Sequence, residues 1–466
     1  MADFPTWGIP NTGDTAWMLT SSALVLLMTP GLAFFYGGMV RAKGVLNMLM
    51  MSISAMGVVG ILWVLYGYSM AFGNDILGTD YGGLLGDPTQ YWGLKGLFGG
   101  VYTQLTPDAP AVNVALAGTI PATVFVAFQA MFAIITVALI SGAVADRLRF
   151  GPWLLFAALW ATIVYFPVAH WVFHFRADLG GITAEKGGWI ANNLHVIDFA
   201  GGTAVHINSG AAGLALCIVL GRRRGWPKTP MRPHNLPFTM LGAGLLWFGW
   251  FGFNAGSAVA SNGVAGATFI TTFTATATAM FGWLLVEKIR DGKPTSLGAA
   301  SGIVAGLVAI TPSCSSVNIL GAITIGLVAG IICALAVGLK YKLGFDDSLD
   351  VVGVHMIGGL VGTLMVGLVG TAAAPAAVNG FFYGGGWHQL GMQALGAFSV
   401  LFYSFTVAAI LALAIKFTIG LRATAEDEEL GIDEAEHAET AYDFATVGTG
   451  TSLSMANAIA GKEAEE

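Results

Sequence analysis

The sequence predicts an all-α polytopic membrane protein with eleven transmembrane helices. Of its 466 residues, 55% are hydrophobic and only 10% are charged, whereas soluble proteins carry about 25% charged residues. Apolar runs of about twenty residues recur along the chain, which is the length that an α-helix needs to cross a bilayer. The runs are continuous, so they lack the alternating pattern of a membrane β-barrel. This composition excludes an ordinary soluble enzyme.

Eleven apolar segments can each cross the hydrocarbon core, although the eighth is only just long enough. Glycine is frequent, with 65 residues, and small residues let membrane helices pack closely. The segments are 16–40, 46–72, 119–144, 152–174, 199–221, 236–260, 263–286, 296–311, 318–339, 351–373 and 391–420.

Lysine and arginine are shared unequally between the loops on the two sides of the predicted bundle. Following alternate connections, only Lys95, Arg176 and Lys186 of the 20 basic residues fall on one side. Cytoplasmic loops carry the excess of basic residues, so we expect the C-terminus in the cytoplasm and the N-terminus outside. A missed span would scramble this pattern, which supports the odd number. The net charge of −7 and the scattered basic residues exclude a nucleic-acid binder.

Hydropathy and charge divide the chain into three parts. Residues 1–15 are an extracellular N-terminal segment, 16–422 are the transmembrane domain and 423–466 are a cytoplasmic acidic tail. The acidic composition of the tail by itself indicates a solvated, partly disordered segment. The two long outside loops, 73–118 and 175–198, have no sign of an independent domain.

Two segments of the chain resemble each other. Asp198-Phe-Ala-Gly-Gly-Thr-Ala-Val-His206 opens the fifth span, and Asp350-Val-Val-Gly-Val-His355 opens the tenth. Each has an acid at the start of the span, then a Val-His pair and a Gly-rich stretch. The fifth and tenth spans are five crossings apart, which is an odd number, so the two helices enter the bilayer from opposite faces. This predicts a five-plus-five inverted repeat, which places a binding site near the midplane.

His206 and His355 lie well inside predicted spans, where ionisable residues are costly and indicate function. Each lies roughly a third of the way in, from opposite faces, so we expect them to meet near the centre. Two unrelated structural histidines are the plain alternative. A meeting pair could ligate a haem, bind a metal or accept hydrogen bonds from a polar solute as neutral rings. A metal would lack a third ligand at similar depth, whereas haem stays open.

Aromatic residues share helix faces towards the outer side. Phe128 and Phe132 are four residues apart on the third span, as are Phe253 and Ser257 on the sixth. Ring faces with a hydroxyl acceptor can hold a small cation, although core packing is the common use of such residues. Asp198 stands where the fifth span begins, where a carboxylate can cap backbone N–H groups or orient backbone acceptors towards a cation.

The outer end of the fourth span holds two rings and two histidines. Trp171 and Phe173 extend the aromatic set. We expect His170 and His174 to face the outside loop and to have no direct role.

Several motifs spread over residues 16–422 carry a family resemblance. They are Phe34-Phe-Tyr-Gly-Gly-Met-Val-Arg-Ala-Lys43, Val126-Ala-Phe-Gln-Ala-Met-Phe132, Pro233-His-Asn-Leu-Pro237, Gly249-Trp-Phe-Gly-Phe-Asn-Ala-Gly-Ser257 and the two His segments above. Together they resemble the ammonium transporter family (Amt/Mep/Rh). The Asp-Phe-Ala-Gly-Gly-Thr run is similar to the bacterial Amt-type branch rather than the Rh branch.

The resemblance implies a role for each candidate residue. The resemblance implies an outer vestibule whose substrate-binding residues are Phe128, Phe173, Trp171 and Ser257. It implies a pore gate made by Phe132 and Phe253 and a pore lined by His206 and His355. Asp198 would support recruitment and deprotonation. Phe173 stands where the family usually has a tryptophan, so either Phe173 or the neighbouring Trp171 supplies the third wall.

The resemblance further implies a homotrimeric ammonium transporter of a bacterial inner or plasma membrane, with no enzyme activity and no cofactor. Ammonium would be deprotonated near the phenyl rings and pass the histidines as ammonia, because a neutral molecule enters an apolar pore at a lower free-energy cost than an ion. The transport would include a net transfer of a proton or charge. A gas-like ammonia channel, an ammonium sensor that does not transport, and a bis-histidine haem protein are the alternatives. Residues 429–442 resemble the segment through which P-II-type regulatory proteins act, which makes the tail a regulatory one.

Overall fold

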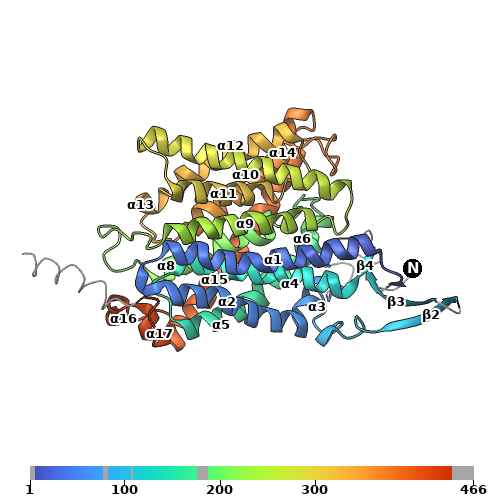
Figure 1. Ribbon diagram of the computed structural model, residues 1–466, viewed down its shortest axis with the longest axis horizontal. Coiled ribbons are helices and arrows are strands. Elements are labelled where there is room, and N and C mark those ends of the chain that lie inside the picture. The colour runs from blue at the N-terminus through green and yellow to red at the C-terminus, as the bar shows by residue number, and fades with distance from the viewer. Residues whose placement is uncertain (1–5, 77–81, 107–108, 176–186, 443–466) are drawn as a thin grey trace, which may run out of the picture.

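The computed structural model describes residues 6–76, 82–106, 109–175 and 187–442, which form a bundle of helices that run side by side (Figure 1). Helices bond all their backbone groups internally, which is the condition for crossing a bilayer. Ten helices of the described residues are long and apolar enough to cross a membrane. The predicted polytopic helical fold is confirmed.

Each predicted apolar segment coincides with a bundle helix, and four of these helices contain a π-helical part. The bundle helices are α1 (Thr12–Met39), α2, η2 and α3 (Val45–Leu62, Trp63–Gly67 and Tyr68–Phe72), α4 (Ala122–Ile140), α5, η5 and α6 (Phe150–Trp160, Ala161–Tyr165 and Phe166–Phe173), η6 and α8 (Gly202–Ile207 and Asn208–Leu220), α9 (Leu236–Gly256), α10 (Gly263–Arg290), α11 (Ser296–Ile310), α12 (Ile319–Ala336), η7 and α14 (Val352–Met356 and Ile357–Val369) and α15 (His388–Thr418). The short helices are α7 (Trp189–Asn192), α13 (Leu339–Leu343), α16 (Ala425–Leu430) and α17 (Ile432–His437).

Helix α11 corresponds to the predicted eighth segment, which is only just long enough to cross a bilayer. It has 15 residues, so it is about 22 Å long at 1.5 Å per residue. The turn residues 311–316 that follow it are buried as well. The chain therefore continues inside the protein after the helix ends.

A small antiparallel sheet accompanies the predicted helices. Strand β3 (Ala109–Ala117) pairs with β1 (Thr6–Gly8), β2 (Gly100–Thr106) and β4 (Ile120–Pro121). Strands β2 and β3 form within the loop 73–118, β1 belongs to the N-terminal segment and β4 immediately precedes α4. The sheet lies at the same end of the bundle as the N-terminus, and α16 and α17 lie at the opposite end (Figure 1).

Polar side chains define where several bundle helices begin. The cap satisfies backbone N–H groups of the first turn that have no partner inside the helix. The side chains that accept such a hydrogen bond are those of Asn11, Asn235, Asn262, Thr295 and Asn318.

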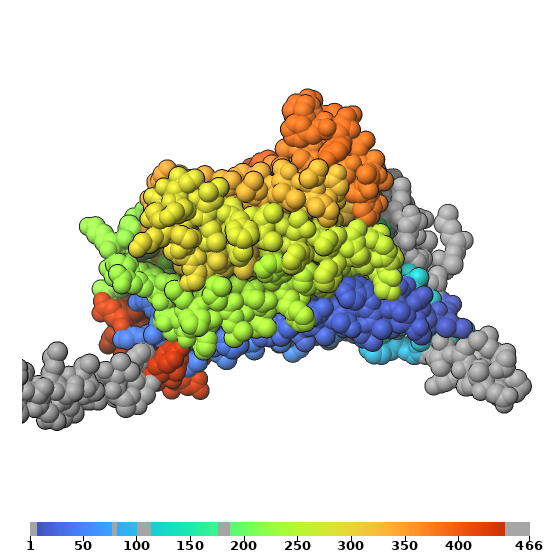
Figure 2. Space-filling view, turned by 45° about the horizontal axis from the view of Figure 1, so that its top comes forward, coloured from blue at the N-terminus to red at the C-terminus, as the bar shows by residue number. Residues whose placement is uncertain are grey.

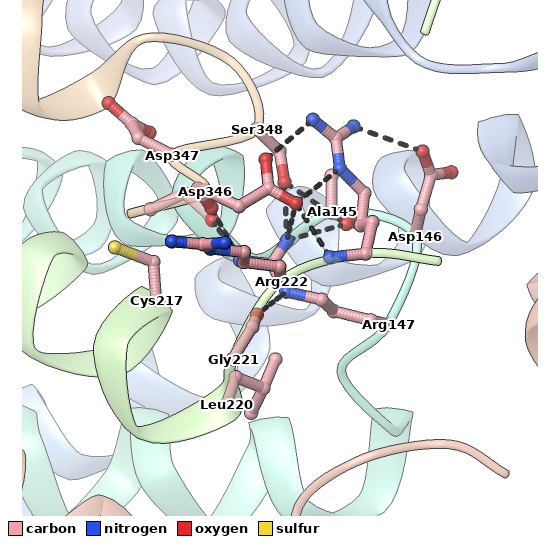
Figure 3. A network of polar contacts seen from close by, with 12 residues as sticks. Ala145, Asp146, Arg147, Cys217, Leu220, Gly221, Arg222, Asp346, Asp347 and Ser348 are labelled. Carbon is pink, nitrogen blue, oxygen red and sulfur yellow. Dashed lines mark hydrogen bonds and ion pairs between the residues drawn. The ribbon is translucent and has the colours of Figure 1, made fainter. Parts of the chain in front are cut away.

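A buried ion-pair network joins three loops at the end of the bundle that holds α16 and α17 (Figure 3). The guanidinium of Arg223 pairs with Asp346 at 2.9 Å and with Asp146 at 3.4 Å. Arg147 donates to the hydroxyl of Ser348 at 2.5 Å and to the carbonyl of Asp346 at 2.6 Å. Burial alone would raise the pKa of Asp346, but its contacts with the two arginines lower it. The loops are thus held together by charges that have partners.

Residues 423–442, the described part of the acidic tail, fold back on the bundle, whereas the acidic composition indicates a solvated segment. The carboxylate of Asp433 accepts hydrogen bonds from the N–H groups of Leu46 at 3.0 Å and Asn47 at 2.7 Å, at the start of α2. Arg422 pairs with Glu428 at 2.5 Å. Figure 2 shows this red segment beside the blue N-terminal part of the chain. Acidic composition did not predict this docking, because it does not show that these carboxylates cap a helix and pair with arginine. Residues 443–466 lie outside the described residues.

Candidate functional site

His206 and His355 meet inside the bundle. Their Nδ1 atoms lie 3.4 Å apart and their ring centroids 5.5 Å apart. Both residues are buried, with 1% and 2% of their surface exposed. Each lies on the π-helical first part of its helix, η6 or η7. The Nε2 atom of His206 has no hydrogen-bond partner among the described residues, so the ring can still bond a polar solute.

Aromatic rings continue from the histidine pair. The ring of Trp250 stacks on His206, with centroids 5.3 Å apart and an interplanar angle of 18°. Phe253 also stacks on His206, at 6.0 Å. The rings of Phe253 and Phe132 lie 4.2 Å apart, and Phe128 contacts Phe132 edge-on at 4.9 Å. The predicted gate and pore residues therefore form one continuous set of ring contacts.

A small cavity of about 30 Å³ lies beside the ring of Phe132. This volume is close to the share that one water molecule takes in liquid water, so the cavity suits a solute of that size. The hydroxyl of Ser257 donates to the carbonyl of Phe253 at 2.8 Å, which leaves its lone pairs able to accept. The lining residues are Phe125, Gln129, Phe132, Phe173, Phe175, Phe199, Ser257 and Val259.

The two candidate rings of the third wall lie in different places. Phe173 lines the cavity, and its ring centroid is 6.5 Å from that of Phe132. Trp171 instead donates from Nε1 to the carbonyl of Leu84 at 2.7 Å and packs its ring on Tyr403 at 4.8 Å. Residues two apart on a helix face different directions, so only one of the two rings can face the cavity.

His170 and His174 are buried, and His170 contacts Asp75 of the loop 73–118, which the sequence predicts to lie outside. They are 0% and 1% exposed. The Nε2 atom of His170 lies 2.6 Å from the carboxylate of Asp75. Burial alone would raise the pKa of Asp75, but hydrogen bonds from His170 and the N–H of Gly83 lower it. The segment after α3 folds over the end of α6 and covers these histidines, and no local pattern reveals such a distant contact.

The carboxylate of Asp198 bonds the backbone at the start of the fifth span. Its oxygens accept from the N–H groups of Gly201 at 2.8 Å, Gly202 at 2.6 Å and Thr203 at 2.7 Å, and from the hydroxyl of Thr203. These bonds hold the first turn of η6, which carries His206. Of the two predicted roles, this geometry favours the cap, through which Asp198 positions the histidine.

The structural counterpart of Asp198 is Asp347, which corrects the expected correspondence with Asp350. Asp347 accepts from the N–H groups of Val351 at 3.1 Å and Val352 at 2.7 Å, at the start of η7. Asp350 has a left-handed φ of 64°, and its carboxylate bonds Lys340 Nζ at 2.7 Å. Asp347 stands eight residues before His355, as Asp198 stands eight residues before His206, whereas the prediction took the nearer acid, Asp350.

Trp250 is a site residue that the sequence reasoning missed. It lies three residues before Phe253 and seven before Ser257, so these residues follow one face of α9. This helical periodicity is the signal that could have identified it. Gln129, which lines the cavity, has the same spacing of three residues before Phe132, whereas Phe199, which also lines it, carries no comparable signal.

The distance of 3.4 Å between the Nδ1 atoms of His206 and His355 suits a hydrogen bond and does not by itself exclude a metal, because two nitrogens on a tetrahedral metal also lie about 3.3 Å apart. A metal site would need further ligands. Within residues 6–76, 82–106, 109–175 and 187–442, no group of three or more His, Cys, Asp or Glu residues could hold a metal ion.

Comparison with known proteins gives a consistent result. The model of the Ammonium Transporter Family matches residues 16–442. An ammonium transporter of Mycobacterium tuberculosis (strain ATCC 25618 / H37Rv) is 70% identical over 461 residues, which cover 97% of this chain and 94% of that protein. An ammonium transporter of Bacillus subtilis (strain 168) is 46% identical over 441 residues, covering 92% and 98%. The crystal structure of Saccharomyces cerevisiae Mep2 superposes with a TM-score of 0.80 and 34% identity, covering 94% of this chain and 92% of that one.

Proposed function

The chain belongs to the ammonium transporter family, and we propose that it recruits ammonium at the cavity beside Phe132, deprotonates it there and passes ammonia along His206 and His355. It is a multi-pass protein of the cell membrane and a transporter rather than an enzyme. The observation that carries the mechanism is the continuous line of rings from the cavity through Phe132 and Phe253 to the two buried histidines.

The chemistry of this line of rings favours deprotonation of ammonium before it passes the histidines. A cation between aromatic rings keeps part of its stabilisation through their faces, and the Ser257 hydroxyl adds an acceptor. Below Phe132 the path is lined by apolar rings, where an ion would lose its hydration at high cost. Neutral ammonia avoids that cost and can bond His206. Potassium has no proton to give up, so it would stop at the vestibule.

We propose that the proton also crosses, so that transport is electrogenic. The test is the current across proteoliposomes after an ammonium jump, with a potassium jump as the control. An ammonium current without a potassium current is expected. No current together with a change of internal pH would contradict proton transfer and favour a gas-like ammonia channel. No current, no pH change and measurable ammonium binding would overturn transport itself in favour of a sensor.

We predict that the third wall of the vestibule is Phe173. Replacing Phe173 with alanine is expected to raise the half-saturating ammonium concentration about tenfold, because a cation–ring contact contributes about 1–2 kcal/mol when partly desolvated. Trp171→Ala is the matched control: it removes a larger ring from the same helix end, and it should lower thermal stability without that change. Concentration–current curves of both variants decide the matter. A larger shift for Trp171→Ala would reverse the assignment.

We also propose that the protein is a homotrimer with one pore in each subunit. We propose that the chain consists of an N-terminal segment 1–15, a transmembrane domain 16–422 and a regulatory tail 423–466. The tail would receive a P-II-type regulatory protein at the cytoplasmic face. Its support is the docking of α16 and α17 on the bundle through Asp433 and Arg422.

The docking of the tail depends on the cap that Asp433 provides to α2. Asp433→Ala is expected to speed hydrogen exchange in 432–437 about tenfold, because a lost cap costs about 1 kcal/mol or more. Glu434→Ala is the control, since Glu434 is the exposed neighbour on the same helix. Equal exchange rates in the two variants would show that Asp433 does not hold the tail.

A further inference from the structure

Trp250 takes part in a hydrogen-bonded network that the proposed mechanism does not use. Its indole Nε1 donates to Oγ1 of Thr311 at 2.8 Å, and the two residues are 2% and 0% exposed. Thr311 follows the last residue of α11, so this bond joins α9 to α11. The Thr311 hydroxyl donates to the carbonyl of Leu307 at 2.7 Å, which leaves its oxygen free to accept the indole N–H.

Asn254 extends this network to α10. Its Oδ1 atom, 3.3 Å from Thr311 Oγ1, is a second and longer acceptor for the hydroxyl proton that the carbonyl of Leu307 also accepts, and its Nδ2 donates to Thr272 Oγ1 at 2.9 Å. Asn254 is one turn after Trp250, so both side chains lie on the same side of α9. Asn254, Thr311 and Thr272 are all fully buried. Three helices are thus tied together by polar groups in the interior of the bundle, where such groups need partners and indicate function.

The network ends on the ring that faces the pore. The Trp250 ring stacks on His206 at 18°, and its centroid is 5.1 Å from that of Phe253. Its N–H edge is the part bonded to Thr311. The face of the Trp250 ring contacts His206 and its edge is hydrogen-bonded, so these two contacts together determine the orientation of the ring. Loss of the edge bond would let the ring tilt against His206.

We propose that Thr311 is a positioning residue for transport: through its bond to Trp250, supported by Asn254, it sets the plane of the ring against His206 and so the passage beside the histidine pair. This inference rests on the proposed function. The other reading of the network is purely structural, with Thr311 joining α9 and α11 and contributing only to stability. The two readings differ in what they predict for transport by the protein that remains folded.

The test is Thr311→Val, which keeps the branched shape and removes the acceptor. Its maximal ammonium current per folded protein is expected to fall about fivefold, since an indole N–H left without a partner reorients or pays its desolvation cost. The half-saturating concentration should stay unchanged, because Thr311 does not line the vestibule cavity. Thr311→Ser restores the acceptor and should recover the current. Thr276→Val is the matched control, because the Thr276 hydroxyl bonds only backbone, the Thr272 carbonyl at 2.7 Å.

A double-mutant cycle with Trp250→Phe separates the two readings. Phenylalanine keeps a ring and lacks the N–H, so Thr311→Val should have no further effect on current in that background. Additive losses in the cycle, no rescue by Thr311→Ser, or a current in Thr311→Val equal to that in Thr276→Val would overturn the positioning role. These outcomes leave the wild-type current intact. Absence of ammonium current in the wild type would instead refute the proposed function, and this inference with it.

Discussion

Replacing Asp198 with alanine is expected to reduce the ammonium current at least a hundredfold. The substitution leaves the buried N–H groups of Gly201, Gly202 and Thr203 without their acceptor, and each such loss costs about 1–3 kcal/mol. The first turn of η6 carries His206. A disordered first turn therefore displaces the histidine from the pore, and the expected effect is on the transport rate of inserted protein as well as on stability.

Asp198→Asn provides a milder form of the same experiment. The amide keeps the shape and one acceptor oxygen, but it places an NH2 donor where a carboxylate oxygen now accepts. Asp14→Ala is the control, because Asp14 accepts from the N–H of Ser261 at 2.8 Å and from the hydroxyl of Thr119 at 2.6 Å and does not line the vestibule cavity. It should lower thermal stability and keep the current. If Asp198→Ala carried half or more of the wild-type current per inserted protein, the positioning role would be refuted.

Removing either pore histidine is expected to lower the ratio of ammonium to potassium current about tenfold. His206 stacks on Phe253 and on His355, so the two imidazoles lie on the proposed path. Alanine would leave room there for a hydrated cation and would remove the hydrogen-bonding group that serves ammonia. A tenfold change corresponds to about 1.4 kcal/mol, the scale of one hydrogen bond. His206→Ala should have the larger effect, because His206 also stacks on Trp250.

Paired ammonium and potassium jumps on the same vesicles measure this ratio. His234→Ala is the matched control, since His234 bonds the carbonyl of Val40 at 3.0 Å and the hydroxyl of Tyr442 at 2.9 Å, between the bundle and the tail. It should keep the wild-type ratio. Wild-type rate and selectivity in both His206→Ala and His355→Ala would show that the pore does not pass along this pair.

Helix positions could be predicted closely from the sequence. The predicted segment 236–260 contains α9 (Leu236–Gly256), and 391–420 overlaps α15 (His388–Thr418) almost completely. The weakest segment, 296–311, is the shortest helix of the bundle. Hydropathy reports a local requirement, because each crossing must be apolar for about twenty residues. The small sheet was not predicted, although β3 (Ala109–Ala117) has nine largely apolar residues, because a short apolar run does not by itself distinguish a strand from a helix.

The candidate site was predicted in composition but not in its supports. His206 and His355 could be paired from the sequence because their segments repeat and their depths match. The choice of Phe173 over Trp171 at the cavity could not be predicted, since the two residues are only two positions apart at one helix end. Asp347 was missed because the repeat was aligned on the acid nearest to His355, although the spacing of eight residues from Asp198 to His206 recurs from Asp347 to His355. Thr311 was missed because only packing brings it to Trp250.

The sequence by itself determined the membrane-spanning architecture, the unequal distribution of charge and the identity of the residues available for chemistry. These properties are local, because the bilayer acts on each segment separately. Tertiary structure alone decided which ring lines the cavity, that His170 is buried against Asp75, and that the tail docks on α2. Each of these depends on contacts between helices or loops distant in the chain, and close packing selects them among many patterns that hydropathy cannot distinguish.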